Sequence, residues 1–119
     1  MKRSLATALA LAAFAAPATA QTMSYVDWVT LPTIERALYI AGAFDQFVTI
    51  YAPPAPDGSG FQAFVLHLGA CVRDRGLDAP TLAAGVHAHA IAHPELQNGP
   101  VPVIMMEYLI AECGLPPAP

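Results

Sequence analysis

Two histidines on one predicted helix are the residues of this chain most suggestive of chemistry. His89 and His93 stand four positions apart, so their imidazoles share one helix face and could bind the same metal ion. No glutamate follows His89, as a zinc protease of the His-Glu-x-x-His type requires. A structural zinc site also needs a complete tetrahedral ligand set. The spacing therefore favours two histidines at the edge of a core, and a metal site is the less favoured alternative.

Asp45 is the second candidate, because it sits beside an otherwise apolar helical stripe. It lies one turn from Ala41 and Val48, a position that would half-bury its carboxylate. A half-buried carboxylate can act as a catalytic acid or base. More often such a group is held by a backbone donor or by an arginine, and Arg73 or Arg75 could serve. We therefore expect Asp45 to have a structural role.

The remaining reactive side chains fit no enzyme template. His67 and His87 point to other helix faces than the His89 pair, and Ser59 lies in Asp-Gly-Ser-Gly rather than a Gly-x-Ser-x-Gly elbow. Cys71 and Cys113 form no Cys-x-x-Cys motif, and in an exported chain they most simply pair with each other. No glycine-rich phosphate loop precedes a helix. We expect no catalytic residues and no cofactor.

The first 20 residues have the three-part layout of a secretory signal peptide. Lys2 and Arg3 form a positive start, an apolar run follows, and small residues at 18–20 form a cleavage site. The run is shorter than the roughly 20 residues that a membrane-spanning helix needs. We expect cleavage after Ala20, which leaves a mature chain that begins at Gln21 and is periplasmic or secreted.

The charge of the mature chain restricts its partners. Removal of the signal leaves three arginines against nine carboxylates, a formal charge of −6, and no lysine. A nucleic-acid-binding protein needs a basic patch to displace counterions from phosphates, and anionic lipids also favour basic proteins. We therefore expect no nucleic acid and no insertion into a membrane after signal cleavage. A basic protein partner would be compatible with this charge.

Hydrophobic periodicity predicts an all-α chain, a compact bundle of about four helices closed by one disulfide. We expect a single helical domain over 21–114, with a lead-in at 21–30 anchored by Trp28 and a proline-rich tail at 115–119. Segment 52–60 has three prolines and two glycines, which predicts a loop. The four helices are expected over residues 33–51, 61–74, 79–93 and 100–113.

Local signals mark the ends and faces of these helices. Gly76 is the expected stop of the second helix, Asp78 the cap of the third, and Pro94 the residue that ends it. The second helix is expected to bury Phe61, Phe64, Val65, Leu68, Cys71 and Val72. The stripe expected to face the core from the first helix comprises Ile34, Ala37, Leu38, Ala41, Phe44, Val48 and Tyr51, widened by Ile40 and Phe47.

The fourth helix is apolar on two opposite sides. One side carries Val101, Ile104, Met105, Tyr108 and Leu109. The opposite side carries Val103, Met106 and Ile110. A helix that is apolar all round is either central in its bundle or covered by a partner. The second side is therefore a candidate partner surface, for a homodimer or another protein, or it is covered by neighbouring helices of the same chain.

A set of short motifs spans residues 28–114. They are Tyr39-Ile40-x-Gly42-x-x-Asp45 in the first helix, Cys71 in the second, His93-Pro94-Glu95 closing the third, and Cys113 closing the fourth. In these motifs the chain resembles the Rap–Tai family, small exported helical proteins known as immunity proteins against type VI secretion toxins. Many members have a further cysteine shortly before the Tyr-Ile-x-Gly block, which this chain lacks. The resemblance implies a helical bundle, periplasmic residence and toxin neutralisation.

Three functions are compatible with these observations. The first is a non-enzymatic binding protein of the periplasm, such as an immunity protein that occludes a toxin surface. The second is an acid-stress chaperone of the HdeA type, which is also small, helical and disulfide-bonded and opens at low pH. The third is a metal carrier that uses His89 and His93. We favour the binding protein, because the acidic charge and the lack of catalytic motifs fit a protein that occludes the surface of a partner and catalyses no reaction.

Overall fold

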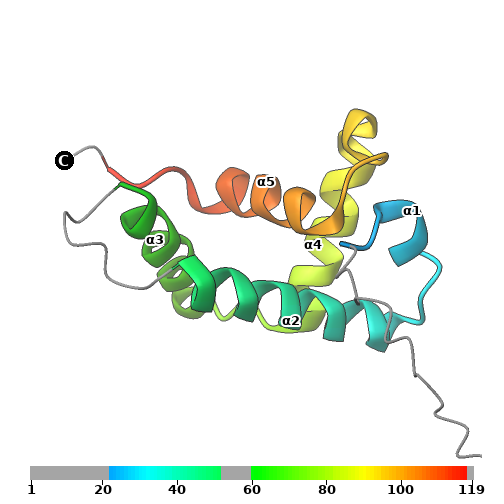
Figure 1. Ribbon diagram of the computed structural model, residues 1–119, viewed down its shortest axis with the longest axis horizontal. Coiled ribbons are helices and arrows are strands. Elements are labelled where there is room, and N and C mark those ends of the chain that lie inside the picture. Colours follow the sequence, from blue (N-terminus) through cyan, green and yellow to red (C-terminus); the bar gives the residue numbers. More distant parts are fainter. Residues whose placement is uncertain (1–21, 52–59, 118–119) are drawn as a thin grey trace, which may run out of the picture.

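The computed structural model describes residues 22–51 and 60–117, and within them the chain is all helical (Figure 1). One isolated antiparallel bridge pairs Ser24 with Pro100, and the described residues contain no β-strand. The predicted fold class is confirmed. The elements are α1 (Tyr25–Trp28), α2 (Thr33–Tyr51), α3 (Gly60–Asp74), α4 (Ala79–Ala92), the 3-10 turn η1 (Pro94–Leu96) and α5 (Val101–Cys113).

Some sequence predictions fall outside these residues. They are the signal peptide with its cleavage site, the body of the predicted loop with Ser59, the side chain of Tyr51 and the last two residues of the tail.

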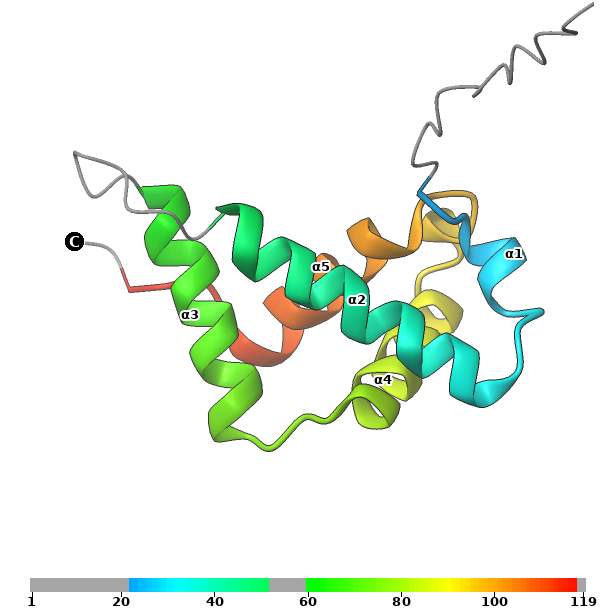
Figure 2. The ribbon, with the colours of Figure 1, turned by 60° about the horizontal axis from the view of Figure 1, so that its bottom comes forward.

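Helix α2 is the element on which the others assemble. Figures 1 and 2 show α4 crossing the first half of α2, α3 lying at its far end, and α5 running along the opposite side of the bundle. Helix α2 contacts α3, α4 and α5, and α5 also contacts α3 and α4. The short helix α1 closes the end of the bundle where α2 begins.

The predicted start and stop signals act as expected around α4. The Asp78 side chain accepts a hydrogen bond from the Thr81 backbone N–H at 2.9 Å and caps the helix. Gly76 leaves α3 with a φ of 62°, a left-handed conformation that a side chain disfavours. Helix α4 ends one residue before the predicted end, because His93, which precedes Pro94, has left the helical region with a φ of −126° and a ψ of 75°.

The core confirms Trp28 as an anchor and corrects the predicted stripe of α2. Trp28 is fully buried, and its indole Nε1 donates to the carbonyl oxygen of Arg36 at 3.2 Å. Ile34 and Leu38, placed at the core by the periodicity, are 70% and 66% exposed. Apolar residues occupy more than half of the helix circumference, so their spacing alone could not locate the centre of the buried face. Packing against α4 and α5 turns α2 toward Ile40, which is fully buried.

The residues before and within α1 are hydrogen-bonded to the start of α5. The backbone N–H of Tyr25 donates to the Gly99 carbonyl at 3.1 Å, and that of Val101 donates to the Met23 carbonyl at 3.0 Å. The Met23 N–H donates in turn to the hydroxyl of Tyr39 at 3.1 Å. These bonds connect α1, α2 and α5 at one end of the bundle.

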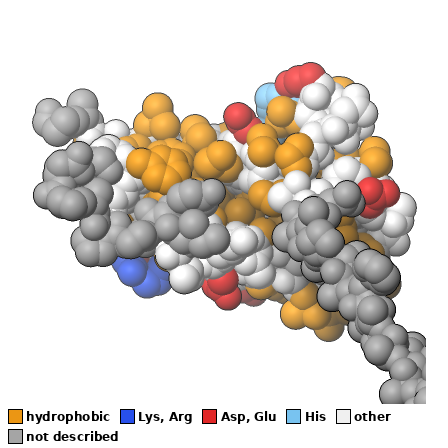
Figure 3. Space-filling model, in the orientation of Figure 1, with side chains coloured by type: hydrophobic (Ala, Val, Ile, Leu, Met, Phe, Trp, Pro, Cys, Tyr) orange, Lys and Arg blue, Asp and Glu red, His pale blue; other side chains and the backbone are white. Residues whose placement is uncertain are grey.

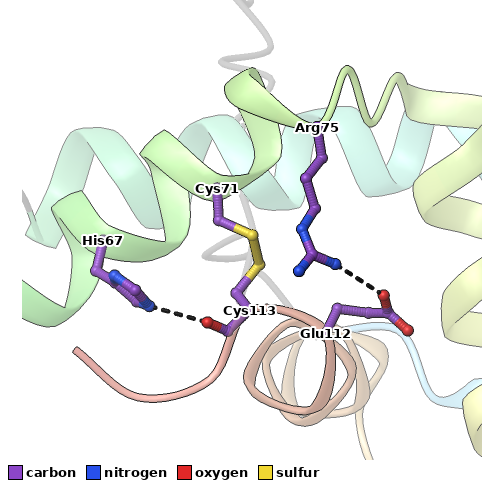
Figure 4. Close-up of polar contacts among 5 residues, drawn as sticks. All are labelled: His67, Cys71, Arg75, Glu112 and Cys113. Atoms are coloured by element: carbon purple, nitrogen blue, oxygen red, sulfur yellow. Dashed lines mark hydrogen bonds and ion pairs between the residues drawn. A yellow bond between two sulfur atoms is a disulfide. The ribbon is translucent and has the colours of Figure 1, made fainter. Parts of the chain in front are cut away.

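The predicted disulfide joins the C-terminal ends of α3 and α5 at the other end. Cys71 and Cys113 are bonded, with 6.0 Å between their Cα atoms and 42 positions between them in sequence (Figure 4). A closed loop of this length contributes about 4 kcal/mol in the chain-entropy model. His67 Nε2 donates to the carbonyl oxygen of Cys113 at 3.1 Å, and Arg75 pairs with Glu112 at 3.2 Å. A disulfide, a hydrogen bond and an ion pair therefore all connect α5 to α3 or to the residue that follows it.

Helices α4 and α5 approach closely because Gly85 has no side chain. A Cβ atom built on Gly85 would overlap the ring of Tyr108. By contrast, a Cβ on Gly42 of α2 would meet nothing within 4 Å. The two helical glycines therefore offer a matched comparison, one with a packing requirement and one without.

We expect Gly85→Ala to lower the free energy of unfolding by about 1–3 kcal/mol, because the added methyl overpacks the α4–α5 contact. Gly42→Ala should raise it by about 0.5–1 kcal/mol, since alanine favours the helix over glycine. Urea unfolding followed by far-ultraviolet circular dichroism measures both. In a Tyr108→Ala background, the further change Gly85→Ala should lower the free energy of unfolding much less than it does in the original protein. A Gly85→Ala protein as stable as the original would contradict this account of the contact.

Candidate functional site

The structure places His89 and His93 together, as their spacing predicted, and without further ligands. Their ring centroids lie 4.3 Å apart, and His93 Nδ1 pairs with Glu95 at 3.3 Å. His67 and His87 contact other residues, the end of α5 and the Tyr25 hydroxyl respectively. Among the residues described, no group of three or more histidine, cysteine, aspartate or glutamate side chains could hold a metal ion. A metal carrier therefore gains no support from this pair.

The environment of His89 affects its protonation. Burial lowers the pKa of His89 below its usual 6.5, and the neighbouring His93 lowers it further. Glu107 and Glu95 act in the opposite direction, but their effects are smaller. Unfolding exposes His89 to water, so the unfolded chain takes up this proton at higher pH than the folded chain does. Stability from this group is therefore complete above about pH 6.5 and declines as the pH falls through that value.

We expect His89→Gln to reduce the loss of stability between pH 7 and pH 5, because glutamine takes up no proton in either state. His93→Gln should reduce it less, since repulsion from His93 is the smaller of the two causes. Urea unfolding at several pH values gives the slopes to compare. If His89→Gln loses as much stability as the original protein between pH 7 and pH 5, His89 is not the source of the pH-dependent loss of stability.

The half-burial of Asp45 and its expected pairing with an arginine are wrong. Its side chain is exposed, because the rotation of α2 toward Ile40 carries it to the outer face. The arginines proposed to hold it pair elsewhere: Arg73 with Asp74 at 3.1 Å, and Arg75 with Glu112. Every aspartate and glutamate within 22–51 and 60–117 is exposed. That part of the chain therefore offers no buried carboxylate for acid–base catalysis.

An apolar groove lies between α2 and α5, and the first turn of α3 forms its end. We call it the α2–α5 groove; its volume is about 390 Å³. In Figure 3 hydrophobic side chains gather over α5 and the space between α5 and α2. The side chains that form its walls include Ala43, Gln46, Phe47, Phe61, Val103 and Met106.

The groove contains most of the predicted partner surface of α5. Val103 is 42% exposed, and Met106 lines the groove beside it. Ile110 is half-buried further along α5 and does not line the groove. The opposite side of the helix is the buried one: Val101, Ile104, Met105 and Leu109 are at most 2% exposed, and Tyr108 is half-buried. Neighbouring helices therefore cover one side of α5, and the described chain leaves Val103 uncovered.

The groove also brings in residues that the sequence assigned elsewhere. Phe47 packs against the core as expected and also lines the groove, whereas Phe61, expected in the core, is 50% exposed and lines the groove. A shallower extension, which shares Ala43 and Gln46 with the groove, is lined by Tyr39 and Gly42. The one feature of the sequence that could have predicted exposure is that these two aromatic residues lie close to the predicted loop.

The family-motif residues are spread over the fold. Tyr39 and Gly42 border the extension of the groove, while Ile40 between them is buried in the core. Asp45 is exposed on α2, His93 and Pro94 lie where α4 meets η1, and Cys71 and Cys113 form the disulfide. The motif residues therefore do not form one site.

Comparison with known proteins adds no relative: no family model, curated protein or solved structure matches the chain. Among the described helices, none is both long and apolar enough to cross a membrane.

Proposed function

We propose that this chain is a non-enzymatic binding protein of the periplasm, which holds a partner protein in the α2–α5 groove. The observation that carries the proposal is the groove itself, where Val103 and Phe61 remain substantially exposed on a small domain. Contiguous exposed apolar surface on a soluble protein is typical of interaction sites. The signal peptide predicted from the sequence supports the compartment.

The composition of the groove favours a helical or extended protein segment over a small molecule. Methionine and aromatic side chains such as Met106, Phe47 and Phe61 adapt to different apolar partners. A groove between two helices is a common receptor for the apolar face of an amphipathic segment. The protein outside the groove is acidic, and Arg73 and Arg75 are already paired. A partner with basic residues flanking its apolar segment would therefore be attracted.

The finer proposal is that this partner is a toxin and that the chain is an immunity protein. The resemblance to the Rap–Tai family supports it, since Tyr39 and Gly42 of the shared motif border the groove. Neutralisation would then act by occlusion, because a bound toxin segment is withdrawn from its target. This mechanism requires a preformed surface and no chemistry.

The first test compares two apolar-to-acidic substitutions at exposed helical positions. Val103→Glu places a charge in the groove, and Ile91→Glu places one on α4 at a residue that is 58% exposed and outside the groove. A partner isolated on the original protein should bind Val103→Glu about 30-fold more weakly or worse, as for an interface hot spot. Ile91→Glu should bind within about twofold of the original. Biolayer interferometry with the purified partner measures both.

The immunity proposal has its own readout. The partner is produced in the periplasm of a host that lacks this chain, and growth is followed with each variant. Growth arrest that is relieved by the original protein and by Ile91→Glu, but not by Val103→Glu, is the expected result. Equal binding by Val103→Glu would refute the groove as the site. Binding without any growth arrest would leave a binding protein that is not an immunity protein.

The lowered pKa values of His89 and of the helix-capping Asp78 favour an acid-triggered chaperone, because both make the fold lose stability in acid. The exposure of every carboxylate within 22–51 and 60–117 opposes it, since no buried charge has to be neutralised as the pH falls. We expect near-ultraviolet circular dichroism to keep its tertiary signal at pH 2.5, with no suppression of client aggregation. Reversible loss of that signal, together with protection of a client protein, would reverse the choice between the two functions.

A further inference from the structure

A second pocket lies on the other side of the bundle, where α1 and the start of α2 meet α4. Figure 2 shows these three elements together at that end of the molecule. The pocket has a volume of about 180 Å³, and it shares no residue with the α2–α5 groove. Its lining combines two basic side chains, Arg36 and His87, with a largely apolar wall formed by Trp28, Ala83 and Ala84. None of the lining residues is a carboxylate.

Arg36 is the unusual member of this lining. The other two arginines of the described chain pair with carboxylates, whereas Arg36 forms no ion pair there. Its Nε is shielded from solvent and has no hydrogen-bond partner. The guanidinium lies 5.8 Å from the centre of the Trp28 ring, and its Nη2 donates to the Thr33 hydroxyl at 3.3 Å. The cation is therefore positioned by neutral groups and lacks an anion.

His87 is the second basic side chain of the lining. Its Nδ1 lies 2.9 Å from the hydroxyl of Tyr25, so this hydrogen bond fixes the orientation of the ring. Arg36 and His87 therefore bring two basic side chains to one pocket.

We propose that this pocket binds a small organic anion with a single carboxylate and a compact apolar group. The carboxylate lies on the guanidinium of Arg36 and accepts from its Nη1 and Nη2 groups, since Nε is shielded from solvent. The Thr33 hydroxyl beside Nη2 then donates to the same group instead of accepting. The apolar part lies along Ala83 and Ala84. A cavity of about 150 Å³ is known to admit benzene, so a ring of that size fits the space.

The experiment uses benzoate as the probe, with uncharged benzamide and inorganic phosphate as its controls. Trp28 is the single tryptophan of the chain and lines the pocket, so its fluorescence reports binding at this place. Isothermal titration calorimetry gives the affinity. We expect benzoate to change the fluorescence and to bind at least about tenfold more tightly than benzamide or phosphate, since only benzoate satisfies both parts of the pocket.

Two matched substitutions locate the site. Arg36→Gln should weaken benzoate at least about tenfold, while Arg73→Gln, the same change at an exposed and paired arginine, should alter it less than about twofold. Ala84→Leu fills the pocket at an exposed position, keeps Arg36, and should weaken benzoate to the same extent as Arg36→Gln. Absence of benzoate binding, equal binding of benzamide or phosphate, or unchanged binding in Ala84→Leu would each overturn the proposal.

Discussion

The hydrogen bonds that fix residues 23–25 against the start of α5 are the constraint on which the rest of the structure depends. They set where α5 begins relative to α2, because Met23 bonds both to Val101 and to the hydroxyl of Tyr39. The groove between these two helices is therefore held open from one end by backbone and side-chain bonds. The same segment leads into α1, whose Trp28 fills the space between α2 and α4. Both the α2–α5 groove and the pocket beside Arg36 depend on this short segment.

The opposite end of the bundle is held by different means. The Cys71–Cys113 bond and the hydrogen bond from His67 join α5 to α3, the helix whose first turn forms the end of the groove. Between these fixed ends the groove is lined by side chains from three helices. A surface of this kind is preorganised, and binding to it loses little conformational entropy. This rigidity suits a protein that acts by occlusion.

Sequence reasoning succeeded where a single local interaction decides the outcome. Helix bounds followed from Asp78, Gly76 and Pro94, whose effects do not depend on distant residues. The disulfide followed from there being only two cysteines in a chain with a predicted export signal. The orientation of α2 could not be predicted in this way, because its apolar residues cover too much of the helix. Packing against neighbouring helices determines which of these apolar residues are buried, and in that arrangement Asp45 lies on the outer face of α2.

In the candidate sites, too, the residues that one helix determines could be predicted, and those that depend on packing between helices could not. Val103 and Met106 could be singled out, since they lie opposite the buried side of α5. The contribution of Phe61 could not, because an aromatic residue at a helix start is indistinguishable in sequence from a core residue. Arg36 and His87 are 51 positions apart in sequence and meet only through the packing of α2 on α4. No periodicity within one helix contains that information.

The way α3 is attached has a consequence for how the protein comes apart. Helix α3 packs chiefly on α2 and α5, and it buries only three side chains, Val65, Leu68 and Val72. The covalent bond between Cys71 and Cys113 therefore contributes much of what keeps α3 attached to the rest of the bundle. Loss of that bond would make α3 a separate opening unit, whose amides exchange with solvent while α2, α4 and the rest of the core stay protected. The redox state of the compartment would thus decide whether the bundle unfolds in one step or two.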